Sequence, residues 1–154
     1  MKKIVLLITV FLFPSLASAR YYGPIIVKTN FSGYSPQEWS KSEKCEVYRD
    51  KIVITKSFGQ NSLLKEERKI ETSGLFNLVS AARNAEVNDE DNRMCDGPAT
   101  HIKAVHILPN DGTEDVLLYT TGGCGAPQKA RVGAQASHLI AIIDSYCPKT
   151  HKLN

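Results

Sequence analysis

Hydrophobic and polar residues alternate along several stretches of the chain, as in β-strands with one buried face. Residues 45–49 alternate, and residues 52–58 are rich in β-branched and aromatic side chains. Residues 63–71 carry many charges and keep Leu64 and Ile70 on one parity. Because lysine and glutamate protect a sheet edge from unwanted pairing, we predict an edge strand here, with a helical turn as the alternative.

The clearest pair of strands covers residues 100–108 and 114–121, separated by the Pro-Asn-Asp-Gly segment 109–112. Asn, Asp and Gly tolerate positive φ, so this segment between two β-rich runs predicts a hairpin. Paired positions of a hairpin lie opposite each other, which puts Cys95 and Cys124 almost opposite at its open end. The spacing therefore predicts a disulfide that closes the mouth of the hairpin.

An apolar stripe at helical spacing predicts a first helix over residues 75–86. Its members are Leu75, Leu78, Val79 and Ala82. Ser73 is the predicted N-cap, since a serine oxygen can accept a hydrogen bond from the free N–H groups of the first turn. The acidic residues 86–96 that follow are predicted to be a linker.

A second and clearer helix is predicted over residues 132–147, ended by Pro148. Its apolar stripe consists of Val132, Ala136, Leu139, Ile140, Ile143 and Cys147. The sulfur of Cys147 therefore faces the core, where it can meet Cys45. The opposite face is small and uncharged: Ala134, Ser137, His138, Ala141 and Ser145. A helix with so little charge is expected to be covered on more than one side, by the N-terminal arm or by a second copy of the chain in a homodimer.

The order of predicted elements is β(weak)-β-β-β-α-β-β-α, with the weak edge strand at residues 24–27 and a loop at residues 125–131. This order predicts an α+β fold: an antiparallel β-sheet with two main helices packed on one face and two disulfides. We divide the chain into a signal peptide (1–19), a partly irregular N-terminal arm (20–44), a single α+β domain (45–148) and a C-terminal tail (149–154).

The first nineteen residues have the features of a secretory signal. Lys2 and Lys3 precede an apolar run at residues 4–13, and Ala17-Ser18-Ala19 matches a cleavage site. The run is too short to anchor the chain, so we expect a periplasmic or secreted protein with no membrane insertion. The net charge of +3 includes both lysines, so cleavage leaves +1. Such a balance argues against nucleic acid or an anionic membrane as a partner.

The cysteines are even in number and all lie after the signal peptide. They are Cys45, Cys95, Cys124 and Cys147. In an exported chain this favours two disulfides over metal ligands or nucleophiles. Four cysteines allow three pairings, of which the hairpin favours Cys95–Cys124 and thus Cys45–Cys147.

Candidate catalytic and metal-binding groups are sparse. His101 and His106 are five apart on one strand and therefore point to opposite faces. Residues 88–92 are rich in oxygen ligands but lack the spacing of a calcium loop. Cys124 would need a free thiol and His138 beside it to act as a nucleophile. We therefore predict no metal, no cofactor and no catalytic residue, and consider an enzyme the less favoured reading.

The leading hypothesis is a small exported binding module, an inhibitor or immunity-type protein acting on another exported protein. Loops held rigid by disulfides lose less entropy on binding, which suits this role. The candidate binding residues surround the hairpin mouth, with two aromatic residues second: Asp96, Gly97, Pro98, Gly123 and Gly125, then Tyr34 and Trp39. The alternatives are an envelope component that assembles with itself and a hydrolase with an unrecognised site.

Overall fold

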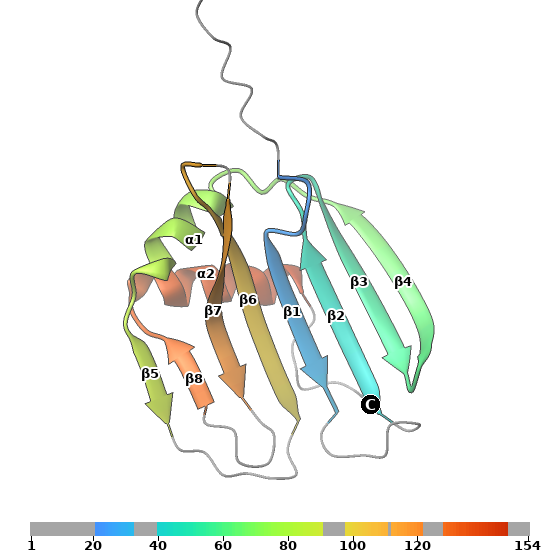
Figure 1. The fold of residues 1–154 in the computed structure, drawn as a ribbon. Helices are drawn as coiled ribbons and strands as arrows, with labels where there is room; N and C mark the ends of the chain where they lie inside the picture. The colour runs from blue at the N-terminus through green and yellow to red at the C-terminus, as the bar shows by residue number, and fades with distance from the viewer. Residues whose placement is uncertain (1–20, 33–39, 91–97, 111, 122–127, 148–154) are drawn as a thin grey trace, which may run out of the picture.

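The computed structural model describes residues 21–32, 40–90, 98–110, 112–121 and 128–147. Within them, an antiparallel sheet of eight strands carries two helices on one face (Figure 1). The elements are β1 (Ile26–Phe31), β2 (Lys41–Val47), β3 (Lys51–Phe58), β4 (Asn61–Lys69), α1 (Leu75–Arg83), β5 (Val87–Glu90), β6 (Ala99–Ile107), β7 (Thr113–Thr121), β8 (Gln128–Arg131) and α2 (Ala134–Tyr146). The predicted α+β class is confirmed.

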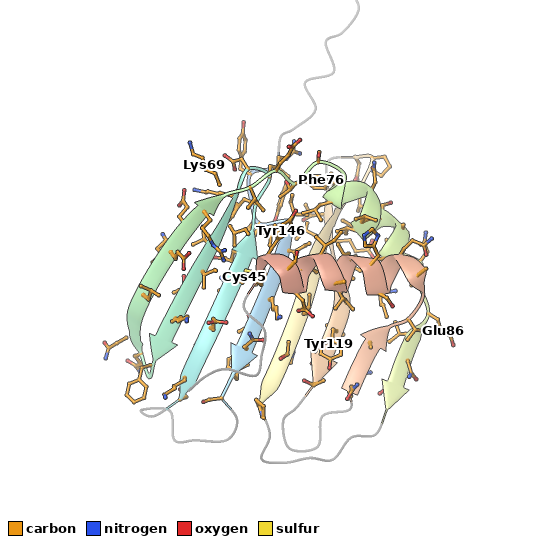
Figure 2. The ribbon with its side chains drawn as sticks, turned by 180° about the vertical axis from the view of Figure 1, so that it is seen from behind. Cys45, Lys69, Phe76, Glu86, Tyr119 and Tyr146 are labelled. Atoms are coloured by element: carbon orange, nitrogen blue, oxygen red, sulfur yellow. A yellow bond between two sulfur atoms is a disulfide. The ribbon has the colours of Figure 1, made fainter. Side chains whose placement is uncertain are left out.

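The strands lie in the order β4-β3-β2-β1-β6-β7-β8-β5. The first four form a meander that runs from the middle of the sheet to one edge. The chain then passes through α1 to β5 at the opposite edge and returns to β6 beside β1 (Figure 1). Seen from behind, α2 crosses the strands instead of running along them (Figure 2). The two halves of the sheet therefore meet at β1 and β6, with α2 across them.

The first strand lies in the middle of the sheet, whereas the sequence indicated a weak edge strand. Ile26 is opposite Val47 of β2 on one side and Ala104 of β6 on the other. The strand runs from Ile26 to Phe31, later than the expected 24–27, and the segment interpreted as an N-terminal arm (20–44) supplies all of β1 and the beginning of β2. The sequence pattern did not predict a central strand, because Lys28 and Asn30 interrupt the apolar residues. Both are nevertheless buried in the structure.

Two strands were not predicted, since β5 occupies part of the expected acidic linker and β8 part of the expected loop. Both have four residues and a polar composition that disfavours strands in isolation. They pair with each other at the sheet edge. Arg131 stabilises this corner, because its guanidinium donates to the carbonyls of Leu117 (2.9 Å), Arg83 (2.6 Å) and Ala85 (2.8 Å).

The hairpin of β6 and β7 is confirmed, and its turn is closed by a hydrogen bond from Leu108 N to the Gly112 carbonyl (2.8 Å). The register shifts inside it: Tyr119 is opposite Ile102, and Leu117 is opposite Lys103. Leu118 is thus the extra residue of a β-bulge. As a result Leu118 and Tyr119 both contribute to the side of the sheet that packs on the helices.

The core lies between the sheet and the helices. The helices bury Leu75, Val79 and Ala82 of α1 and Ala136, Leu139 and Ile143 of α2. The predicted cap of the first helix was wrong. Gly74 is the N-cap, with φ of 88° and no side-chain cap, while the Ser73 hydroxyl bonds to the Glu71 carboxylate (3.3 Å). Glycine suits this position because other residues are strained at such positive φ.

A disulfide joins Cys45 of β2 to Cys147 at the end of α2, across a sequence separation of 102 residues. This is one of the two disulfides that the sequence predicts. In the chain-entropy model a loop of that size contributes about 4.7 kcal/mol as an upper figure. Both cysteines are buried, so the bond fastens the end of α2 to the core. Cys95 and Cys124 lie outside the described residues, and only the first disulfide is seen among those described.

Candidate functional site

The sheet has one face under the two helices and one face that no described helix covers (Figures 1 and 2). Side chains alternate between the faces along each strand. Cys45 and Val47 of β2 point to the helices, so Glu46 points to the open face. Its neighbours across the sheet are Val53 of β3 and, beyond that, Glu67 of β4. The open face of these three strands is the candidate functional site.

A groove with a volume of about 850 Å³ lies on this face. Its lining comes from the segment before β1 and from β2, β3 and β4, and includes Tyr21, Tyr22, Tyr48, Val53, Lys65 and Glu67. We call this the tyrosine groove. A volume of this size is within the usual range of ligand-binding clefts.

The turn between β2 and β3 positions one end of the groove. It is closed by a hydrogen bond from Tyr48 N to the Lys51 carbonyl (2.8 Å). Tyr48 and Lys51 therefore lie close together, and the Lys51 ammonium is 5.7 Å from the centroid of the Tyr48 ring. A cation at this distance attracts the face of the ring, which helps to hold Tyr48 in place.

The segment before β1 contributes two tyrosines with different environments. The Tyr21 hydroxyl donates to the Pro24 carbonyl (3.2 Å), and a Cβ at position 23 would overlap the Tyr21 ring, so a side chain in place of Gly23 would have to displace that ring. Burial raises the pKa of the Tyr21 phenol, helped by the charge of Asp115 and by Tyr48. Tyr22 is 82% exposed. One ring is therefore held in place while the other is presented to solvent.

Three charged residues of the lining have ion-pair partners, Lys51 and Glu67 with each other and Glu46 with Lys44 outside the lining. Lys51 Nζ lies 3.2 Å from Glu67 Oε1, and Lys44 Nζ lies 2.6 Å from Glu46 Oε1. These pairs are largely exposed and add little to stability. Lys65 has no ion-pair partner among the described residues. Arg49, which also lines the groove, has no ion-pair partner among the described residues either, and its guanidinium lies over the Phe76 ring. The groove thus combines aromatic surface, partly paired charge and two cations without an ion-pair partner in the described part of the chain.

The lining of this groove does not include Pro98, one of the residues predicted to bind a partner. Of them the structure describes only Pro98, which is exposed. It precedes Ala99, which pairs with Phe31 at the end of β1 away from the tyrosines. The other six lie outside the described residues: Asp96, Gly97, Gly123, Gly125, Tyr34 and Trp39. The adjacent Tyr21 and Tyr22 could have indicated a binding surface from sequence alone, but Tyr48 lines the same groove only because of the fold.

The histidines are dispersed. His101 faces the open side of β6, with Nδ1 2.8 Å from Thr120 Oγ1 and its ring 5.9 Å from the Phe31 ring centroid. His106 lies on the other face of the strand, and His138 is exposed on α2. Among the described residues, no three His, Cys, Asp or Glu side chains gather closely enough to hold a metal ion.

The face of α2 and the apolar character of the helices are relevant to possible partners. The small face of α2, predicted to be covered, is exposed: Ala134, Ser137, His138, Ala141 and Ser145. In the described parts of the chain, neither helix has the length and apolar character needed to cross a membrane.

Comparisons with protein-family models, with curated proteins and with solved structures find no match for this chain.

Proposed function

We propose that this protein is an exported binding module that holds a segment of another exported protein in the tyrosine groove. The observation that carries the proposal is the gathering of Tyr21, Tyr22 and Tyr48 on a sheet face without a described helix over it. Tyrosines are enriched where binding energy is concentrated, because they offer large contact area for few rotatable bonds. The signal-like N-terminus supports export.

The chemistry of the groove favours one kind of segment. Because Lys51 pairs with Glu67, a bound segment needs no charge opposite these two residues. The tyrosine rings and Val53 suit an aromatic or aliphatic side chain. Lys65 remains available at β4 for a carboxylate. We therefore propose a loop that inserts an apolar side chain with an Asp or Glu beside it.

A rigid frame suits such a role, because a preorganised surface loses less entropy when it binds. Cys45–Cys147 fastens β2, one wall of the groove, to α2 behind it. We propose that Cys95–Cys124 is a second disulfide and closes the hairpin of β6 and β7. A stapled protein that occupies a partner's surface in this way would act as an inhibitor or immunity-type protein.

The test is a comparison of matched variants on one partner. The mature protein is used to recover stoichiometric partners from periplasmic extract, and the affinity for the recovered partner is then measured. Tyr22→Ala and Tyr48→Ala should each weaken binding about tenfold or more, as expected for anchor residues. Val87→Ala, at the 44% exposed Val87 on the far edge strand β5, is the control and should bind as the wild type does.

Two results would overturn the proposal. One is a partner whose affinity is the same for wild type, Tyr22→Ala and Tyr48→Ala. The other is the absence of any stoichiometric protein partner combined with a small molecule that raises thermal stability, which would favour an enzyme.

A second candidate function is self-assembly in the cell envelope through the small, uncharged and exposed face of α2. Light scattering of the mature protein separates it from the first. A homodimer would be broken by Ala141→Glu at the centre of that face. A strictly monomeric protein at all concentrations would remove the argument for assembly.

A further inference from the structure

A second groove, of about 510 Å³, lies on the other side of the sheet, along the flank of α2. Strands β1, β6, β7 and β8 form its base. Figure 2 shows Tyr119 on this face, beside α2 and at a distance from Cys45. The polar lining consists of Lys28, Thr100, Tyr119, Arg131, Ser137 and Asp144. We call this the helix-flank groove. It is separate from the tyrosine groove and shares no lining residue with it.

Lys28 is the most unusual member, since it is only 1% exposed at the centre of a sheet. Its Nζ lies 2.6 Å from Asp144 Oδ1, the one acceptor that it has among the described residues. A lysine ammonium has three donors. Leaving buried donors unpaired is costly, and more so when the group is charged. Lys28 therefore presents unused donors where it lines the groove.

The buried polar residues beside Lys28 have more hydrogen-bond and ion-pair partners than Lys28 has. Asn30 Nδ2 donates to Glu43 Oε1 (3.4 Å), and the Thr100 hydroxyl donates to Asn30 Oδ1 (3.2 Å). Glu43 also lies 3.4 Å from Lys56 Nζ. These groups support one another, as buried polar networks generally do. The unused donors of Lys28 are thus not a general feature of this face.

Arg131 brings a second cation to the same groove. Its Nε and Nη1 donate to the three carbonyls of Leu117, Arg83 and Ala85, which holds the guanidinium in one orientation. Nη2 has no such bond, and no carboxylate pairs with Arg131 among the described residues. An arginine held in this way is well suited to bind a carboxylate or phosphate.

The groove therefore carries an excess of one positive charge. Lys28 and Arg131 contribute two, and Asp144 offsets one. The first turn of α2 has neither an acidic residue nor a side-chain cap, so its free N–H groups add to the positive potential. The remaining lining residues are apolar: Ile102, Ala130, Val132 and Ile140. Charge and surface together suit a monoanion with an apolar body.

We propose that the helix-flank groove binds a small organic monocarboxylate. Its carboxylate accepts hydrogen bonds from the unused donors of Lys28, and its short apolar body lies against Ile102 and Ile140. Arg131, three strands away in β8, adds positive charge at the other side of the groove. The hydroxyls of Tyr119 and Ser137 are additional donors in the lining.

The probe for the test is hexanoate, with hexanamide as a neutral compound of the same shape. Titration of the mature protein, followed by amide chemical shifts, should show saturable binding of hexanoate that perturbs signals of β1, β8 and the first turns of α2. Hexanamide should bind at least tenfold more weakly. Equal binding of the two compounds would overturn the proposal, as would inorganic phosphate competing as well as hexanoate.

Two variants make the test specific. Lys28→Met should weaken hexanoate binding at least tenfold, and if that variant does not fold, Ser137→Asp should do the same. Ser137 is exposed near the start of α2, where an added carboxylate is compatible with the helix. Gln135→Asp puts the same charge in the same turn of α2, at an exposed residue outside the lining that is two positions from Ser137 and therefore points to nearly the opposite side of the helix, and should bind hexanoate within twofold of wild type. Undiminished binding by Ser137→Asp would exclude this groove as the site.

Discussion

Lys28 Nζ and Asp144 Oδ1 lie 2.6 Å apart and connect the central strand to the last helix across 116 residues of sequence. The two side chains differ in environment, since that of Lys28 is 2% exposed and that of Asp144 is 39% exposed. In such a pair the buried charge loses its hydration and the exposed one does not, so the main effect of the ion pair is to offset the desolvation cost of the buried charge. Asp144 is thus the group that makes a charged residue tolerable in the middle of the sheet.

Because only Lys28 is buried, we expect removal of Asp144 and removal of Lys28 to lower the free energy of unfolding by different amounts. Asp144→Ala leaves a buried ammonium without its acceptor and should lower the free energy of unfolding by about 2–3 kcal/mol, less than for a fully buried pair. Lys28→Met removes the buried charge itself, and water can solvate the half-exposed Asp144 that remains. It should therefore cost less than Asp144→Ala. Urea unfolding of both variants measures the difference, and a larger loss for Lys28→Met would contradict this account.

The start of α1 offers a test of the corrected cap. Ser73→Ala should change the free energy of unfolding by no more than about 0.5 kcal/mol, because its hydroxyl bonds to Glu71 and not to the helix. Gly74→Ala should cost about 1 kcal/mol or more, because φ is 88° there. Thermal and urea unfolding of the two single variants decide between the caps. A loss of about 1 kcal/mol for Ser73→Ala would restore serine as the N-cap.

Tyr21 predicts a specific dependence of stability on pH. Burial raises its pKa in the folded protein above the ordinary value of 10.0. Between the unfolded and the folded pKa the folded state binds more protons, so the free energy of unfolding falls as pH rises through this window and is unaffected below it. Tyr21→Phe should therefore lose less stability than wild type between about pH 9 and 11. Urea unfolding over this range measures it.

The control is Tyr22→Phe at the 82% exposed neighbour, which should keep the wild-type dependence. Identical alkaline curves for wild type and Tyr21→Phe would show that Tyr21 does not contribute.

The disulfides predict a definite peptide map. Digestion without reductant should yield one fragment pair joined through Cys45 and Cys147 and a second joined through Cys95 and Cys124. Cys147→Ala with Cys45→Ala should cost about 2–5 kcal/mol, the usual loss for a native disulfide in a small exported domain. Cys124→Ser should leave Cys95 reactive toward thiol reagents. Four reactive thiols in freshly purified wild type would contradict both bonds.

Local sequence patterns account for a large part of this fold. The turn residues and alternating strands of the β6–β7 hairpin, and the apolar stripes of α1 and α2, depend on neighbours within a few positions. The placing of Cys147 at the end of the apolar stripe likewise anticipated its meeting with Cys45. These features follow from periodicity, because each element must present one apolar side to a core.

Other features depend on segments far apart in the chain, which no local pattern contains. The central place of β1, the pairing of β5 with β8 and the burial of Lys28 all require partners that arrive only with the complete sheet. The tyrosine groove is of this kind too, since Tyr21 and Tyr48 come from different segments. Sequence alone determined the class of fold, its helices, its hairpin and one observed disulfide. Tertiary structure decided the strand order and both grooves, because the pairing of distant strands selects which polar residues can be buried.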